Sequence, residues 1–526
     1  MSKSMAAEEI PSEVVRDSDA LHLAQLGYKQ ELDRNFSQWT LISFGVTLSA
    51  TWVAIGGALG TGIYNGGPPG IVYGFILVFF GQCFVGATIA EFASSYPTTG
   101  GMYHWTAMLA PEKYAPTLSY ITGWNTVLAY IVSVASVTCV SGQQIVALAG
   151  IAKEDLVVQR WHSFLTMELL NLVTLIMVVF FNKIFPLLNG VGLWWFLSSL
   201  VIISVTVLAM TPGFRSPHDV FVEFINNTGW STNGMAFITG IVNPLFAISV
   251  LDSTCHISEE VPEPEKNVPK AVLYTLIAAL VEGWLFMMVI FFSYQDLDLI
   301  LENPWELPIA ELFHQATGTR AGTFGLTFLL MVSGLWTVWN CQLSQGRIYW
   351  SFARDNAVPM SRFFSHVDSN LKVPVRAHLL CAFIVALLGL LYMWAETAFA
   401  AFISSANIFF NITYLIPLVV NIVRQRRSLV PGWFYMRRFG MLINIIAMVW
   451  LLFLIACLGL PYVMPVTPEN MNYTWVIVGG GLLFEVVLFA FKRREYRGPV
   501  LKGLEVVMES EEVLDVHDSD NPKKKI

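Results

Sequence analysis

Charged side chains are scarce in this sequence. They make up 13% of its 526 residues, whereas hydrophobic residues make up 55%. A water-soluble globular protein carries about 25% charged residues. The scarcity of charge excludes a large soluble domain and indicates an integral membrane protein.

Motifs for chemistry are also missing. The six cysteines are scattered through or beside the apolar runs, without metal-ligand spacing or an extracellular pairing pattern, so we predict no structural disulfide. The sequence contains no Walker motif, nucleotide fold or cluster of histidines and cysteines. We therefore expect a protein that is not an enzyme, has no cofactor or metal and binds no nucleic acid. The missing nucleotide motifs also argue against any process driven by ATP.

Long apolar runs, in contrast, are abundant. A helix needs about 20 apolar residues to cross the hydrocarbon core of a bilayer. We predict an all-α membrane protein with about twelve transmembrane helices. The candidate spans lie near residues 41–64, 70–95, 118–148, 164–184, 191–210, 234–257, 270–293, 322–346, 376–394, 398–421, 440–460 and 474–491.

The two ends of the chain are polar. Residues 1–38 contain no apolar core of the signal-peptide type, so we expect a cytosolic tail there and a second one at residues 492–526, with the membrane domain at 39–491 between them. This topology places nearly all Lys and Arg residues on the inner side, as the positive-inside rule requires. It places two glycosylation sequons, at Asn226 and Asn472, on the outer face.

Two of the apolar runs carry residues that weaken a helix near mid-span. The first holds the adjacent glycines Gly56 and Gly57, and the second holds Pro244 shortly before a lone acid, Asp252. Glycine weakens a helix by roughly 1 kcal/mol relative to alanine, and proline removes a backbone donor, so we predict that both runs unwind there. Interrupted helices at corresponding positions in two halves of a chain indicate a substrate site at the membrane midplane.

The residues at these interruptions are the predicted substrate contacts. They are Trp52, Ile55, Gly56, Gly57, Phe246, Ser249 and Asp252, with Trp336 as a further aromatic candidate. Trp52 and Phe246 occupy similar places in the two runs, so their rings could box a cationic head group through cation-π attraction. Tyr130, Trp336 and Trp339 are further candidates for such a box, although helix packing is the more common role for each.

Acids inside apolar runs are costly, and function concentrates at them. Asp252 could face the substrate, carry a coupling proton or cap the interrupted helix. Glu91 ends the second span beside small residues and a proline, which favours gating or packing at the inner face. Glu168, Glu282 and Glu485 have no comparable context, and we assign them no site role.

Loops of opposite charge are predicted on the cytosolic side. One loop, residues 258–270, is rich in glutamate, and another region carries Arg347, Arg354 and Asp355. Together they could form an inner gate. Solvated loop ends are the alternative, because exposed ion pairs contribute roughly 0 to 1 kcal/mol.

Several ordered stretches resemble the fungal amino acid and choline permeases of the amino acid, polyamine and organocation superfamily. The similarity covers nearly all of residues 35–491. The stretches that carry it are Gly62–Pro68, Glu91–Gly101, Asn226–Trp230, Asn243–Pro244, Leu251–Asp252, His256–Glu260, Ser351–Pro359 and Met464–Tyr473.

This resemblance implies a fold of two inverted five-helix repeats, at residues 41–210 and 234–421, with helices 1 and 6 broken. Two peripheral helices follow at residues 440–491. It also implies import of a small amine across the plasma membrane, with a proton as the coupling ion by analogy with fungal permeases. For choline, aromatic rings around the trimethylammonium group and a nearby acid would be the chemical logic, since that group donates no hydrogen bond.

The predicted site departs from the choline permease pattern. After its tryptophan that pattern has an aromatic residue and a glycine, where this chain has Val53 and Ala54, and it has a tryptophan in the second interruption, where this chain has Phe246. An amino acid or 4-aminobutyrate permease therefore stays open, because bared backbone N–H groups at Gly56 and Gly57 would suit a carboxylate. A transporter dedicated to a secondary metabolite and a non-transporting nutrient sensor are further alternatives.

Overall fold

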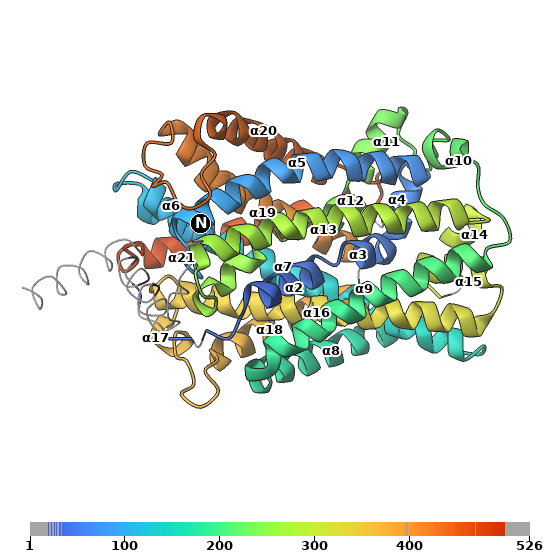
Figure 1. Ribbon diagram of the computed structural model, residues 1–526, viewed down its shortest axis with the longest axis horizontal. Helices are drawn as coiled ribbons and strands as arrows, with labels where there is room; N and C mark the ends of the chain where they lie inside the picture. Colours follow the sequence, from blue (N-terminus) through green and yellow to red (C-terminus); the bar gives the residue numbers. More distant parts are fainter. Residues whose placement is uncertain are drawn as a thin grey trace, which may run out of the picture.

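The computed structural model describes residues 34–303, 305–394, 398–468 and 470–499, together with six residues nearer the N-terminus, Asp19, Leu23, Leu26, Tyr28, Glu31 and Leu32. Within these residues the regular structure is entirely helical. The long helices lie side by side along the longest axis of the molecule (Figure 1). The all-α fold is confirmed.

Eleven helical stretches in the described part of the chain are long and apolar enough to cross a membrane. The first is Gln38–Gly57, formed by α2 (Gln38–Ser49) and α3 (Thr51–Gly57). The others are α5 (Gly67–Ser95), α7 (Ala115–Ala152), α8 (Arg160–Phe180), α9 (Phe185–Met210), α13 (Pro264–Ser293), α16 (Arg320–Arg354), α18 (Val375–Trp394), α19 (Ala398–Val423), α20 (Gly440–Leu458) and α21 (Thr474–Lys492).

The predicted span at residues 234–257 is the one that differs. It contains a shorter apolar stretch, α11 (Asn233–Gly240) followed by α12 (Val242–Ala247), and then a 3-10 helix, η2 (Ser253–Glu260). The remaining short helices connect the spans. They are α4 (Leu59–Tyr64), α6 (Met102–Leu109), α10 (Pro217–Phe221), α14 (Leu297–Leu301), α15 (Pro308–Thr317) and α17 (Ser361–Phe364).

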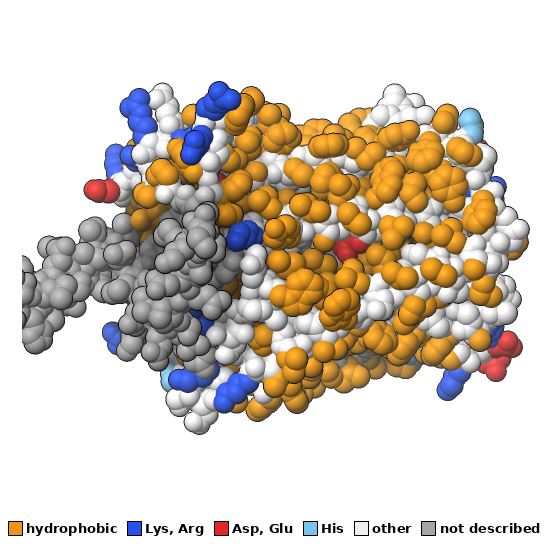
Figure 2. Space-filling model, in the orientation of Figure 1, with side chains coloured by type: hydrophobic (Ala, Val, Ile, Leu, Met, Phe, Trp, Pro, Cys, Tyr) orange, Lys and Arg blue, Asp and Glu red, His pale blue; other side chains and the backbone are white. Residues whose placement is uncertain are grey.

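Hydrophobic side chains cover the flank of the molecule, as expected for contact with lipid (Figure 2). Lys and Arg side chains gather at one end, where α5 finishes and where α6, α17 and the C-terminal end of α21 lie (Figures 1 and 2). We call this the basic end.

The first predicted span is interrupted at two places. Helix α2 ends at Ser49, where Ala50 adopts the left-handed conformation with φ 41° and ψ 48°, and α3 follows. Helix α3 ends at Gly57, and Ala58, with φ −108° and ψ 20°, separates it from α4, so the later of these two interruptions directly follows the predicted glycine pair. A Cβ atom at Gly57 would lie 2.8 Å from Val140 Cγ1, so this glycine also allows α3 to approach α7 closely.

The second interruption lies after the proline rather than at it. Pro244 occupies the first turn of α12, where the backbone N–H has no partner within the helix and its loss costs little. The helix ends at Ala247, and Val250 has φ 58°, a rare conformation for a β-branched residue. The chain therefore unwinds between α12 and η2.

The two interrupted helices are fastened to each other. The side-chain amide Nδ2 of Asn243 donates to the carbonyl oxygen of Ala58 at 2.6 Å, and α12 packs against both α3 and α4. The hydroxyl of Thr51 donates to the carbonyl oxygen of Ala247 at 2.9 Å. These bonds join the end of one helix segment to the break in the other, so the two breaks lie next to each other.

Candidate functional site

A cavity lies at the two breaks, between α2, α3, α7, α16 and the segment after α12. The volume open to the centres of water molecules is about 40 Å³, which is room for about three waters. A larger ligand would require the helices to separate. The lining residues are Leu48, Ser49, Ala50, Val53, Ala54, Ser133, Val137, Val140, Ser141, Gln144, Phe246, Ser249, Val250, Gly334, Thr337 and Cys341.

Gln144 lines this cavity with a side-chain amide that has no hydrogen-bond partner among the described residues. It is fully buried, and neither its Oε1 nor its Nε2 has a partner among the described residues. Glycines on two neighbouring helices give it space, since Cβ atoms at Gly57 and Gly334 would lie 3.4 Å from Nε2 and 3.3 Å from Oε1. An unpaired buried amide costs about 1–3 kcal/mol, so a ligand that bonds to it would be stabilised.

The predicted contacts divide into two groups. Phe246 and Ser249 line the cavity, as does Ala50, at which the first helix breaks. Six predicted contacts are not among the lining residues: Trp52, Ile55, Gly56, Gly57, Asp252 and Trp336. Sequence reasoning missed Gln144, whose only signal is a pair of adjacent polar side chains, Gln143 and Gln144, within the largely apolar helix α7.

Trp52 packs against other helices. Its ring lies 5.3 Å from that of Phe196 on α9 and 5.5 Å from that of Phe286 on α13. The side chain is fully buried. A box formed by Trp52 and Phe246 around a cation does not fit this placement, because only Phe246 lines the cavity.

The remaining predicted contacts also serve packing. A Cβ atom at Gly56 would lie 3.1 Å from Leu330 Cδ1, so its open side faces α16. Ile55 is fully buried. The indole Nε1 of Trp336 donates to the carbonyl oxygen of Leu188 at 3.2 Å, which fixes α16 against α9.

Removing the Trp52 ring should therefore act on folding. We expect Trp52→Ala to destabilise the protein by about 3–5 kcal/mol, the usual cost of emptying a buried aromatic site. Trp52→Phe should keep most of the folded protein. The measurements are the amount of monodisperse protein and its melting temperature. The KM of the folded fraction for its transported substrate is measured beside them. A raised KM with unchanged stability would contradict this packing role.

Glu282, which was assigned no site role from sequence, holds the first break in place. Its Oε1 accepts a hydrogen bond from the backbone N–H of Thr51 at 3.1 Å, at the start of α3. Its Oε2 is buried and has no partner in the described part of the chain. Because Thr51 follows Ala50, the carboxyl group lies directly beside the residue whose left-handed backbone breaks the helix.

Asp252 belongs to a closed hydrogen-bond network at the second break. Its Oδ1 accepts from the hydroxyls of Tyr130 at 3.1 Å and Tyr414 at 2.8 Å. Its Oδ2 contacts Nε2 of His256 at 2.9 Å. Asp252 and His256 are both fully buried. The network ties η2 to α7 and α19, one helical turn nearer the basic end than Ser133, which lines the cavity.

Two buried ion pairs lie at the basic end, between η2 and α16. Arg347 Nε bonds to Glu260 Oε1 at 2.8 Å, and Arg354 Nη2 bonds to Glu259 Oε1 at 2.9 Å. The Arg354 guanidinium also lies 4.1 Å from the ring centroid of Tyr28. Burial alone would raise the pKa of Glu259, but Arg354 and a hydrogen bond from the Thr99 backbone outweigh it and lower that pKa. These side chains are therefore not solvated loop ends.

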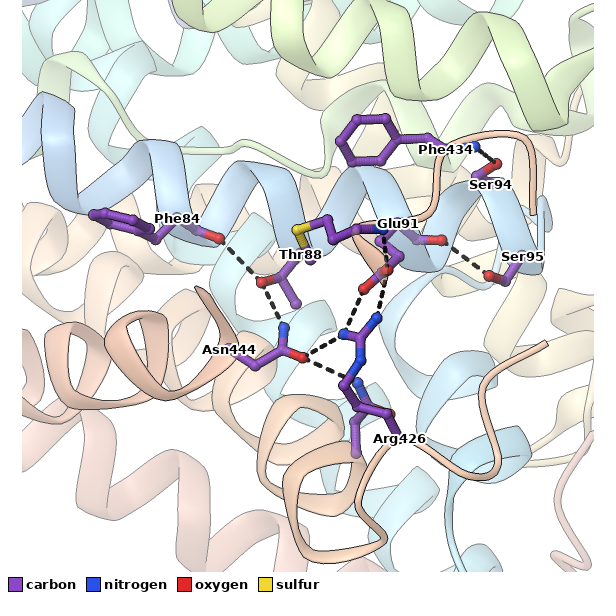
Figure 3. A network of polar contacts seen from close by, with 10 residues as sticks. Phe84, Thr88, Glu91, Ser94, Ser95, Arg426, Phe434 and Asn444 are labelled. Atoms are coloured by element: carbon purple, nitrogen blue, oxygen red, sulfur yellow. Dashed lines mark hydrogen bonds and ion pairs between the residues drawn. The ribbon is translucent and has the colours of Figure 1, made fainter. Parts of the chain in front are cut away.

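Glu91 forms a separate network between α5, α19 and α20 (Figure 3). Its carboxylate receives both ends of the Arg426 guanidinium, at 2.6 and 2.8 Å, and the backbone N–H of Met436 at 2.7 Å. Arg426 also donates to Asn444 Oδ1 at 2.7 Å, and Asn444 Nδ2 donates to the hydroxyl of Thr88 at 3.0 Å. Glu91 thus fastens the basic end of α5, in line with a gating or packing role.

The two predicted glycan acceptors differ in accessibility. Asn226 is half-buried, and its amide Nδ2 donates to the Trp230 carbonyl at 3.0 Å. Asn472 is 7% exposed, and its Nδ2 donates to the carbonyl oxygens of Leu458 and Leu460. A glycan at Asn472 would have to break both bonds, so Asn226 is the better acceptor.

Many apolar membrane-length helices around an enclosed cavity define a multi-pass membrane transporter, and comparison with known proteins agrees. The sequence profile described as Amino acid permease matches residues 36–482. The chain belongs to this family, within the amino acid, polyamine and organocation superfamily.

Named relatives cover several substrates. The chain is 34% identical over 88% of its length to the choline transporter of Saccharomyces cerevisiae, of which the match covers 82%. It is 30% identical over 92% of its length to the amino-acid permease BAT1 of Arabidopsis thaliana, with 97% of that protein covered. It is 28% identical over 86% of its length to the swainsonine transporter swnT of Arthroderma benhamiae, with 90% covered.

Proposed function

We propose that this protein imports choline or a related small amine across the plasma membrane, coupled to the movement of a proton. In this proposal the basic end and both termini face the cytosol. The similarity to the choline transporter of Saccharomyces cerevisiae supports the choice of substrate class. The carrying observation is the chemistry of the cavity at the two breaks.

Of the described residues that line the cavity, none carries a charge. A quaternary ammonium group donates no hydrogen bond, so apolar and aromatic contacts such as Phe246 suit it. The hydroxyl group of choline needs one polar partner, and Gln144 offers both an open donor and an open acceptor. A substrate carboxylate would find no Lys or Arg here. The Thr51 N–H at the start of α3 is already bound to Glu282.

The alternative is a permease for amino acids or 4-aminobutyrate. The similarity to the amino-acid permease BAT1 supports it, and an unpaired Gln144 amide could also donate to a carboxylate. The similarity to swnT keeps a secondary metabolite among the candidate substrates. All three hypotheses about the substrate place it in the same cavity.

For the mechanism, we propose alternating access between two inverted repeats, residues 41–210 and 234–421. The broken helices would rock as one body, because Asn243 and Thr51 join them. Opening toward the cytosol would separate η2 from α16. That motion breaks the Glu259 and Glu260 ion pairs, which therefore serve as the inner gate.

The test is uptake of radiolabelled choline by yeast that lacks its own choline permease and expresses this chain. We expect saturable uptake that other quaternary amines inhibit and that 4-aminobutyrate and common amino acids do not. Empty-vector cells are the control. Uptake of labelled amino acids in place of choline would overturn the choline assignment, and surface-expressed protein that carries no member of the panel would contradict the transport function itself.

A further inference from the structure

His256 is held between two acceptors deep inside the protein. Its Nδ1 lies 3.0 Å from the carbonyl oxygen of Thr99, and its Nε2 lies 2.9 Å from Asp252 Oδ2. The ring packs edge-to-face on Tyr130, with centroids 5.3 Å apart. Both His256 and Asp252 have side chains that are fully shielded from solvent.

The hydrogen-bond pattern fixes the number of protons. A carbonyl oxygen only accepts, so Nδ1 must carry a hydrogen for the contact with Thr99. The contact between Nε2 and Oδ2 also needs a hydrogen, because without one two lone pairs would face each other. An ionised Asp252 beside a neutral His256 has only one hydrogen for these two contacts, the one on Nδ1. The pair therefore holds one additional proton, shared between Nε2 and Oδ2.

We propose that His256 and Asp252 form the site that binds the coupling proton, and that this proton holds the inner gate closed. The inference rests on the proposed proton-coupled import and names the site for that proton. The proton enters between Nε2 and Oδ2 and leaves to the cytosol from the same position. The only bond made and broken is the N–H or O–H bond of this proton.

Thr99 connects this site to the gate. Its carbonyl oxygen accepts from His256, while its own backbone N–H donates to Glu259 Oε1 at 3.2 Å. Glu259 in turn pairs with Arg354. One residue thus transmits the position of the His256 ring to an ion pair of the gate. Loss of the proton removes the Asp252 contact and releases this end of η2.

Other titratable groups surround the pair. Tyr130 on α7 and Tyr414 on α19 donate to Asp252, and the thiols of Cys255 on η2 and Cys341 on α16 lie close enough to sense its charge. Beyond Thr99 stand Glu259 and Arg354. The hydroxyls of Tyr130 and Tyr414 keep donating to Oδ1 whether or not the proton is bound, so the proton changes the His256 contact alone.

This arrangement explains how a proton is kept from leaking. A carrier that has bound a proton without substrate keeps its inner gate closed. Substrate in the cavity must provide the energy that opens the gate, after which the proton meets the cytosol. Ser249 and Val250 line the cavity, and Asp252 lies two residues beyond Val250 in the chain.

The decisive variant is Asp252→Asn. An asparagine there keeps an oxygen for the two tyrosine hydroxyls and turns an NH2 group toward Nε2 of His256. Neutral His256 can then accept at Nε2 and still donate to Thr99 from Nδ1. Every hydrogen bond survives without the additional proton, so the variant should fold and mimic the protonated site permanently.

Transport is measured in proteoliposomes with the substrate found for the wild type and the membrane potential clamped at zero. With a gradient of one pH unit, coupling to one proton accumulates substrate about tenfold. The wild type should reach this ratio and acidify the lumen. Asp252→Asn should reach equal concentrations on both sides and move no protons. Glu485→Gln is the matched control, because Glu485 is a buried acid bound to Asn125 on α7, and it should behave like the wild type.

Accumulation by Asp252→Asn with proton movement would overturn the proposal. So would proton movement that is lost in Glu282→Gln and kept in Asp252→Asn, since it would place the proton at the first break. Substrate accumulation by the wild type without any proton movement would overturn it as well.

A second measurement does not depend on finding the substrate. The melting temperature of the purified full-length protein is followed between pH 5 and pH 8. The wild type should lose stability as pH rises and the additional proton is lost, and Asp252→Asn should lack that part of the decrease. Equal pH dependence in the two proteins would refute the proton site. A clear difference with no transport by the wild type would instead show that the proposed function is at fault.

Discussion

Glu260→Ala should destabilise the protein by about 3–5 kcal/mol, because it leaves a buried charge without its counter-ion. The Arg347 side chain is fully shielded from solvent. Without Glu260, its remaining acceptor among the described hydrogen bonds is Asn182 Oδ1, at 3.1 Å from Nη2. The measurement is thermal unfolding of the purified wild type and of the purified variant, both without ligand.

A double-variant cycle separates the pair from its surroundings. Glu260→Met with Arg347→Met should recover most of the lost stability, since an apolar pair of similar size avoids the desolvation cost. Glu154→Ala is the matched control, because the pair of Glu154 with Arg320 is exposed and such pairs contribute little. Wild-type melting of Glu260→Ala would show that the inner ion pair contributes nothing to the closed state.

Gln144→Leu should lower kcat/KM for choline about 5- to 150-fold, which corresponds to about 1–3 kcal/mol for the loss of a buried hydrogen-bonding partner. Leucine has a similar volume, so the cavity should keep its shape. The measurement is initial uptake rate against choline concentration in cells with matched surface expression. Folding should be unaffected, because Gln144 has no described hydrogen bond to lose.

Gln143, the neighbour of Gln144 in the chain, provides the control. Gln143 is half-buried and donates to the hydroxyl of Tyr392 at 3.0 Å, away from the cavity lining. Gln143→Leu should leave kcat/KM nearly unchanged. Ethyltrimethylammonium, which lacks the choline hydroxyl, should inhibit the wild type and Gln144→Leu equally well. Preferential loss of its inhibition in Gln144→Leu would show that the amide does not bind the hydroxyl group.

Sequence reasoning located the spans because apolar length is a property of each segment alone. Eleven of the twelve predicted spans correspond to helices of membrane length, and both interrupted regions were found. Phe246 and Ser249 line the cavity at the two breaks, and their role as substrate contacts stays a prediction. Of the two alternatives for the charged loops at the basic end, the ion pairs of Arg347 and Arg354 exclude solvated loop ends, and the inner gate stays a prediction.

The exact break points could not be predicted from local propensity. Ala50 is an ordinary helix former, and its left-handed conformation persists because Thr51 is bonded to Glu282 and to Ala247. These partners are about two hundred residues away in the chain. Glu282 and Gln144 were missed for the same reason, because their roles depend on which helices face them.

The attachment of α20 to α5 has a consequence for the modularity of the fold. The last two helices were predicted to be peripheral, yet Asn444 and Met436 complete the hydrogen bonding around Glu91 and Arg426 (Figure 3). A fragment ending before residue 436 would keep this acid and this cation but lose two of their partners. Helix α20 is therefore part of the minimal folding unit, and shortened versions for expression should retain it.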